Sequence, residues 1–345
     1  MSVKDELAEA KGDQERARAI GDLARQQRTA RELRALIRSQ AEEIDDLDRK
    51  LAIKLNADAR SPIKIARAKK QAGQPMTPIC LWSDWHVEEP VRLEQTAGRN
   101  EFSPDIAKVR FERLINTTAK MIRREMRFAS VGEIVIATMG DFMSGNIHPD
   151  LAETGMTPPI ETAGIVHALL LDGLKFVADE TKIERVLVPT CYGNHGRINQ
   201  GRPRISTGSK HNLEQWVYQL VARDLADDSR FRFDVGDTAF KYLELGDFRV
   251  RFHHGDAFGY GGGVGGISVP YYRAMARWEQ ETHADLTCIG HWHQQRDFQN
   301  GVVNGSLIGT SEYSRLHGFE HPQQMVLWID RARDRKEAVH PVFLD

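Results

Sequence analysis

The chain has 345 residues, of which 41% are hydrophobic and 28% are charged, and its formal net charge is −2. This length exceeds what one minimal core needs and suits one large globular domain with an appendage. A net charge this close to zero excludes neither acidic nor basic partners, so the charge of each segment has to be interpreted separately.

The cysteines and the apolar runs indicate the compartment. Cys80, Cys191 and Cys288 each lie in or beside an apolar run. An odd, small number of cysteines argues against a disulfide framework and favours a reducing environment. No apolar run approaches the roughly 20 residues that span a bilayer, and the N-terminus lacks a secretory segment. We therefore expect a cytoplasmic protein without a membrane partner.

Residues 1–72 predict a helical arm. Residues at a-type and d-type heptad positions are Leu23, Gln26, Ala30, Leu33, Ile37, Gln40, Ile44, Leu47 and Leu51. This spacing is typical of a coiled coil, although glutamines occupy two d positions. Gly12 and Gly21 weaken the beginning of the helix. Three interpretations stay open: a homo-oligomer through this helix, a helix packed on the main domain, and partial disorder.

The end of this arm is basic. Eight lysine and arginine residues lie between positions 49 and 70, opposed there by Asp58 alone. Such a run suits contact with phosphates, and it is equally typical of a solvated linker. Residues 71–75 contain glycine and proline and form the expected boundary. We therefore predict an arm over 1–72 and a main domain over 75–345.

From Thr77 onward, short apolar strands alternate with longer amphipathic segments. Strands are expected at 78–82, 133–139, 184–190, 231–235, 239–245, 249–252, 285–289, 302–308, 325–329 and 338–343, and helices at 105–128, 160–178, 213–225 and 270–283. This alternation predicts a layered α/β domain with mixed strand directions toward the C-terminal half.

Five polar clusters each follow an apolar strand. They are Ser83–His86, Gly140-Asp141, Gly193-Asn194-His195, His253–Asp256 and Gly290–His293. In open α/β sheets the ligand site lies beyond the carboxyl ends of the strands. We therefore expect these clusters to converge in one crevice, although they are spread over some two hundred positions.

The clusters supply carboxylates, imidazoles and one amide, which suit borderline first-row metal ions. None contains a cysteine, so a structural thiolate zinc site is disfavoured. There are too many ligands for one tetrahedral ion and about enough for two. Because a carboxylate has two oxygens, Asp141 is the natural bridge between two ions in a site that acts on phosphoryl groups.

The ordered series Asp84-x-His86, Gly140-Asp141, Gly193-Asn194-His195, His254-Gly255 and Gly290-His291-x-His293 resembles the calcineurin-like metallophosphoesterases over residues 75–293. The resemblance implies a four-layer α/β/β/α sandwich with two divalent metal ions, Mn²⁺ first and Fe, Zn or Ni as alternatives. In layout the chain is similar to phage or prophage members described as exonuclease-like, which implies the cytoplasm of a bacterium or of a phage-infected host cell.

The resemblance also implies residue roles. One ion is expected on Asp84, His86, Asp141 and His293, and the other on Asp141, Asn194, His254 and His291. His195 resembles the histidine that protonates the leaving oxygen, while a metal-bridging hydroxide attacks the phosphorus. On a strand, the adjacent His253 and His254 point to opposite faces. We choose His254 as the ligand because it directly precedes Gly255.

One departure concerns the tuning of His195. Many members of the family place an acidic residue after the Gly-Asn-His turn, whereas here Gly196 and Arg197 follow. The orientation of His195 must then come from elsewhere, and Asp256 and Asp84 are both candidates. Arg197 is either a partner for a substrate phosphate or a surface arginine.

The rim of the site suggests a substrate. Candidate substrate contacts are Arg197, Arg202, Arg204, Tyr271 and Arg273, with the glycine-rich loop 259–266 and two tryptophans, Trp85 and Trp292, nearby. Cations with aromatic rings suit an extended polyanion, because bases stack on rings. Ordinary packing is the alternative for each.

Three functions follow. The first is a nuclease or phosphodiesterase acting on DNA, with nucleic acid as the partner. The second is a phosphomonoesterase acting on a phosphoprotein or a small phosphate ester, and the third is a non-enzymatic, metal-stabilised assembly module. A proton-donating histidine counts against the third function, since a binding module does not need one.

Overall fold

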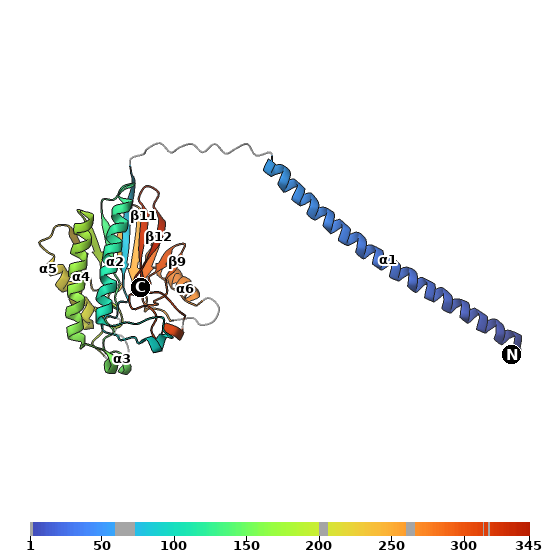
Figure 1. The fold of residues 1–345 in the computed structure, drawn as a ribbon, viewed down its shortest axis with the longest axis horizontal. Coiled ribbons are helices and arrows are strands. Elements are labelled where there is room, and N and C mark those ends of the chain that lie inside the picture. The colour runs from blue at the N-terminus through green and yellow to red at the C-terminus, as the bar shows by residue number, and fades with distance from the viewer. Residues whose placement is uncertain (1–2, 59–72, 200–205, 260–265, 313, 317) are drawn as a thin grey trace. The chain divides into compact units, whose positions relative to one another are not determined.

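The computed structural model describes residues 3–58, 73–199, 206–259, 266–312, 314–316 and 318–345, with the backbone alone for 3–10, 14, 48–58 and 316 (Figure 1). The chain divides into two compact units, Met1–Lys69 and Lys70–Asp345. Arg202 and Arg204 lie outside the described residues, as do most of the basic run before residue 70 and most of the glycine-rich loop.

The described residues of the first unit form one helix, α1 (Val3–Asp58), which continues through Gly12 and Gly21. Local ion pairs such as Arg28–Glu32, at 3.2 Å, support it at i, i+4 spacing. Its apolar heptad side chains are exposed, Ile37 by 63% and Ile44 by 60%. A helix of this length is therefore present, and no described residue of the first unit covers its apolar stripe.

The larger sheet of the second unit is built around four parallel strands. They are β1 (Gln74–Trp82), β3 (Ile134–Thr138), β4 (Val186–Pro189) and β5 (Phe231–Asp234). Two antiparallel strands, β11 (Gln323–Asp330) and β12 (Arg335–Phe343), extend the β1 edge, and β2 (Ala129–Ser130) pairs with the start of β1.

The second sheet has the order β6-β7-β8-β10-β9. The strands are β6 (Lys241–Leu245), β7 (Phe248–His253), β8 (Leu286–Ile289), β10 (Gly301–Val303) and β9 (Arg296–Phe298). The central strands β7, β8 and β10 are parallel, and both edges are antiparallel. The strand expected at 302–308 is shorter than predicted: β10 ends at Val303, after one further backbone bond from Asn304 N to Ile289 O (2.7 Å), and the Asn304 side chain donates to Ser83 Oγ (2.9 Å).

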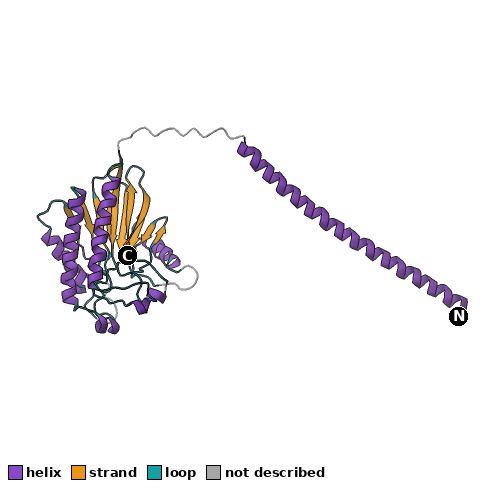
Figure 2. Ribbon diagram, viewed as in Figure 1, coloured by secondary structure: helices purple, strands orange, loops and turns teal. Residues whose placement is uncertain are grey.

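Side-chain alternation makes four layers. On β1, Cys80 and Trp82 face a core shared with the helices, whereas Ile79 and Leu81 face the second sheet. The covering helices are α2 (Pro104–Glu125), α4 (Pro159–Thr181) and α5 (Leu213–Asp224) on the first sheet and α6 (Ser268–Trp278) on the second (Figure 2). The α/β/β/α sandwich expected from the sequence is confirmed.

Short elements complete the unit: α3 (Pro149–Thr154) and the single turns η1 (Leu93–Thr96), η2 (Ser209–His211) and η3 (Ser314–Leu316). The three cysteines are buried and unbonded, as expected, and burial raises the pKa of the Cys80 and Cys191 thiols to about 12. Within the described residues, no helix combines the length and the apolar character needed to cross a bilayer.

Candidate active site

The five polar clusters lie beyond the carboxyl ends of β1, β3, β4, β7 and β8. Strands β1, β3 and β4 are parallel in one sheet, and β7 and β8 are parallel in the other. The carboxyl ends of parallel strands meet at one edge, so the clusters of both sheets come together there. Within each sheet the clusters are joined by backbone bonds, from Asp84 N to Gly140 O (2.9 Å) and from Gly290 N to His254 O (2.7 Å), and His291 N joins the two sheets by donating to Asp84 Oδ1 (2.9 Å).

The first group of metal-ligand type is Asp84, His86 and His293, whose ligand atoms lie within 4.8 Å of one another. The Nε2 atoms of His86 and His293 face each other at 3.2 Å. The Ser144 hydroxyl donates to Glu89 Oε2 (2.8 Å), so it accepts from His86 Nδ1, also at 2.8 Å. This leaves the His86 Nε2 lone pair directed at the group, as a metal ligand requires.

The electrostatics of this group separate its two imidazoles. Burial, together with His195 and His293, holds the pKa of His86 well below its usual range. Burial opposes the charged form of His293 too, but Asp84, 3.5 Å away, raises the pKa of His293. Asp84 thus favours the charged form of His293, and because a ligand imidazole must be neutral, a metal ion bound at this place would displace a proton from it.

The second group is Asp141, His254 and His291, again with ligand atoms within 4.8 Å of one another. His254 Nδ1 donates to the Met139 carbonyl (2.7 Å), and its Nε2 lies 2.9 Å from Asp141 Oδ2 and 3.1 Å from Asn194 Oδ1. Burial opposes both charges, yet this contact raises the pKa of His254 and lowers that of Asp141 well beyond their usual ranges. Asn194 thus lies beside the second group and could supply a neutral oxygen ligand.

Backbone strain is concentrated in these two groups. Eight described residues other than glycine have a left-handed φ, and five of them are candidate ligands: Asp84 (56°), His86 (48°), Asp141 (54°), His291 (70°) and His293 (53°). Such conformations cost about 1–3 kcal/mol each and persist where the surroundings enforce them, which is typical of functional sites.

The donor set fits two divalent cations. Asp84, Asp141 and His254 are at most 1% exposed, and burying charged or polar groups so close together requires compensation. In addition, the buried Nδ1 of His291 has no hydrogen-bond partner among the described residues. Two carboxylates, four imidazoles and one amide oxygen match the ligands that borderline first-row metals accept.

His195 stands beside both groups. Its backbone N–H donates to Asp141 Oδ1, and its Nδ1 donates to the Ser144 carbonyl, both at 2.9 Å. The ring lies edge-on to His86, with centroids 4.9 Å apart. The sequence offered Asp256 or Asp84 as its orienting group. That expectation is corrected, because a backbone carbonyl accepts from Nδ1 and orients the ring. Nε2 is the ring nitrogen that this hydrogen bond does not use.

The other histidine of the β7 cluster has a packing role. His253 Nδ1 accepts from Gly255 N (2.8 Å), and its ring packs against Phe240 and Trp278, with centroids 4.5 and 5.1 Å away. Burial lowers the pKa of His253 to about 4. His253 and His254 therefore point to opposite sides, and His254 is the one that enters the candidate metal site.

A cavity of about 1230 Å³ opens over the two groups and is lined by both His86 and His195. Its wall includes Trp292, which stacks on Phe258 with ring centroids 5.7 Å apart. Five carboxylates other than Asp141 line it, namely Glu89, Asp150, Asp256, Glu312 and Glu320, whereas Arg92 is the one arginine or lysine among the described lining residues. The cavity outside the candidate metal positions is therefore acidic.

Among the described residues, none of the expected substrate contacts lines this cavity. Arg197 Nη1 donates to the Asn194 carbonyl (3.0 Å), and neither Arg197 nor the exposed Arg273 is a lining residue. Tyr271 is 0% exposed and stacks on Phe298. The expectation that its ring stacks on a nucleic-acid base is therefore wrong, because the ring is not accessible to a base. Trp85 is likewise buried in the core, in contrast to Trp292.

Sequence reasoning missed several residues that hold the site. Ser144 orients both His86 and His195, and Glu88 accepts from the Ser144 and Gly145 amides at 2.9 and 2.8 Å. Glu214 and Asn212 bond to the turns that carry Asp141 and Asn194. Of these residues, Asn212 alone could have been noticed from the local sequence, because it is a helix-capping residue directly before α5.

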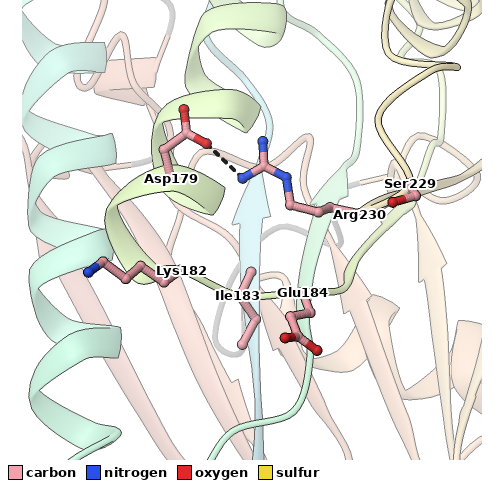
Figure 3. Close-up of a pocket in the computed structure, with 6 residues that line it drawn as sticks. All are labelled: Asp179, Lys182, Ile183, Glu184, Ser229 and Arg230. Carbon is pink, nitrogen blue, oxygen red and sulfur yellow. Dashed lines mark hydrogen bonds and ion pairs between the residues drawn. The ribbon is translucent and has the colours of Figure 1, made fainter.

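A second cavity, of about 580 Å³, lies before the starts of β4 and β5 (Figure 3). Arg230 crosses it to Asp179 at 2.6 Å, and the other labelled residues are Lys182, Ile183, Glu184 and Ser229. It is at the opposite end of the strands from the polar clusters and contains no metal-ligand group among its described lining residues.

No protein-family model matches the chain, and no curated protein matches it either. Solved structures with detectable similarity include a Vps29 variant from Entamoeba histolytica, with 13% identity, coverage of 78% of this chain and 99% of that one, and a TM-score of 0.32. A dimetal phosphatase from Danio rerio has 10% identity, with coverage of 78% of this chain and 99% of that one and a TM-score of 0.32. A 5'-nucleotidase from Candida albicans has 12% identity, with coverage of 80% of this chain and 52% of that one and a TM-score of 0.31. The residue roles in this chain therefore rest on its own contacts.

Proposed function

We propose that this chain is a metal-dependent phosphoesterase of the calcineurin-like metallophosphoesterase type, using two divalent ions, with Mn²⁺ as the first candidate. The observation that carries the proposal is the meeting of the two ligand groups with His195 in one cavity. Asp84, His86 and His293 would hold one ion, and His254, His291 and Asn194 the other, with Asp141 between them. Two such ions activate water and neutralise charge on the phosphoryl oxygens.

His195 is the proposed proton donor. The Ser144 carbonyl accepts from Nδ1, so the protonated ring has its second N–H, on Nε2, available for the leaving oxygen. As the phosphorus–oxygen bond breaks, that proton passes to the departing alkoxide. The hydrogen bond from His195 N to Asp141 Oδ1 fixes this ring relative to the candidate metal ligands.

The acidic cavity wall favours a compact phosphate ester. A phosphate group at the metal positions is compensated by the cations there, but each further phosphate would face Glu89, Asp150, Asp256 or Glu312. Glu320 is paired with Arg296 at 3.1 Å and contributes less. We therefore place a small phosphate ester or a phosphorylated side chain first among the substrates.

DNA cleavage, the first expectation from the sequence, is the second candidate. The observation that favours it is a local stretch of α1 in which Arg25, Arg28, Arg31, Arg34 and Arg38 are exposed, three of them also paired with carboxylates on the same helix. Such a surface binds phosphates without base specificity. In this proposal α1 contacts the nucleic acid, and the cavity receives one phosphodiester at a time.

One assay series tests the function. The Mn²⁺-loaded protein is given p-nitrophenyl phosphate, bis-(p-nitrophenyl) phosphate, and labelled single- and double-stranded DNA. His195→Ala is the inactive variant, and His167→Ala, which removes a surface histidine paired with Asp224, is its control. Turnover of the monoester without DNA cleavage would exclude the nuclease. No turnover with Mn²⁺, Fe²⁺, Zn²⁺ or Ni²⁺ would refute the phosphoesterase and favour the assembly module.

A further inference from the structure

Position 196 follows the catalytic turn and has no side chain, and other residues fill the space beside it. A Cβ placed on Gly196 would lie 2.6 Å from Asn212 Oδ1 and 2.7 Å from Glu214 Cγ. Gly196 is not among the residues with a left-handed φ, so its backbone tolerates a side chain. Glycine is needed there because the space is occupied.

The occupant is the Glu214 side chain, which comes from the first turn of α5 and is 0% exposed. Its Oε1 accepts from Phe142 N at 2.6 Å, and its Oε2 accepts from Gly193 N at 2.7 Å. Phe142 directly follows Asp141, and Gly193 directly precedes Asn194. One buried carboxylate therefore joins the turn with the proposed bridging ligand to the turn with the proposed proton donor.

These two turns are in very close contact. A Cβ on Gly193 would lie 2.1 Å from Asp141 Oδ1, and a Cβ on Gly140 would lie 2.2 Å from Gly193 N. Asn212 completes the attachment, because its Nδ2 donates to the Gly193 carbonyl (2.7 Å) while its Oδ1 caps α5 by accepting from Glu214 N (2.9 Å). Both backbone groups of Gly193 are thus held from α5.

We propose that Glu214 is a positioning residue of the active site, which holds from helix α5 the backbone amides of Phe142 and Gly193, next to Asp141 and Asn194. The claim about turnover rests on the proposed function, whereas the claim about metal binding does not. A side chain at position 196 would disturb this arrangement, because its Cβ would lie 2.7 Å from Glu214 Cγ and 2.6 Å from Asn212 Oδ1.

The test removes the carboxylate. Glu214→Ala is compared with the full-length wild type in Mn²⁺ calorimetry, thermal unfolding and turnover of p-nitrophenyl esters. We expect Glu214→Ala to weaken Mn²⁺ binding about 10- to 100-fold, as the loss of groups that orient ligands does.

Two further variants separate positioning from folding. Glu214→Gln keeps the shape but turns an amide N–H₂ toward one of the two backbone donors, so we expect an intermediate affinity. Gln215→Ala is the matched control, because Gln215 is buried on the same helical turn but donates to Gly236 O. Its Mn²⁺ affinity should stay within about twofold of wild type even if its Tm falls, since it touches no ligand turn.

The proposal would be overturned by a folded Glu214→Ala or Glu214→Gln variant that binds Mn²⁺ as the wild type does. If the wild type hydrolyses no phosphoester, the proposed function fails, yet the Mn²⁺ affinities still decide the role of Glu214.

Discussion

Replacement of Glu88 tests how the loop after Asp141 is held. The Glu88 side chain is 2% exposed, and its Oε1 accepts from the backbone amides of both Ser144 (2.9 Å) and Gly145 (2.8 Å). Glu88→Ala leaves two buried amides without an acceptor. At roughly 1–3 kcal/mol for each orphaned donor, we expect the free energy of unfolding to fall by about 2–6 kcal/mol.

Glu88→Gln separates the hydrogen bonds from the charge. Its amide oxygen can accept from both amides, and Glu88 Oε2 has no partner among the described residues. Burial raises the pKa of Glu88, so the folded state holds this proton to a higher pH than the unfolded state. Wild-type stability should therefore decline as pH rises above the ordinary value of 4.5, and Glu88→Gln should lack this part of the decline.

Urea unfolding followed by tryptophan fluorescence is the assay, because all six tryptophans lie between residues 82 and 328 and report the second unit alone. We expect Glu88→Gln to stay within about 1 kcal/mol of wild type near pH 5. If Glu88→Gln and Glu88→Ala lowered the free energy of unfolding equally, Oε2 would be shown to have an essential partner. A loss below about 1 kcal/mol in Glu88→Ala would show that the two amides find other acceptors.

Three further predictions concern the metals and the arm. His195→Ala should retain both ions in elemental analysis yet lose about 10²–10⁴-fold in kcat, whereas Asp141→Ala should lose metal; equal metal loss in both would contradict the role of His195. Gly193→Ala should lose Mn²⁺ binding in calorimetry because its methyl overlaps Asp141 Oδ1, whereas Gly164→Ala, with open space around its Cβ, should keep it. If the exposed apolar stripe of α1 forms a coiled coil with a second copy of the chain, removal of residues 1–72 should convert the oligomer to a monomer in sedimentation. The full-length Ile37→Lys/Ile44→Lys variant should do the same. An unchanged mass in both would exclude this interface.

Local patterns were sufficient for the layered α/β class and for the polar clusters. Apolar alternation places Ile79 and Leu81 on one side of β1 and Cys80 and Trp82 on the other, so the two-sided burial of that strand follows from its sequence. Each cluster also lies directly after its strand. A short strand and the residues after it are adjacent in sequence, so their relation can be predicted without tertiary contacts.

The tertiary structure decided how the site is held and what surrounds it. Glu214 bonds to amides 21 and 72 residues away, and the Ser144 carbonyl is 51 residues from His195. Bonds between a side chain and a distant backbone group leave no periodic pattern in sequence, because any polar residue brought near can form them. The burial of Tyr271 and the acidic wall of the cavity likewise depend on which segments pack together. The sequence by itself thus determined which residues gather at the strand ends, and the packing of distant segments determined their orientation and their surroundings.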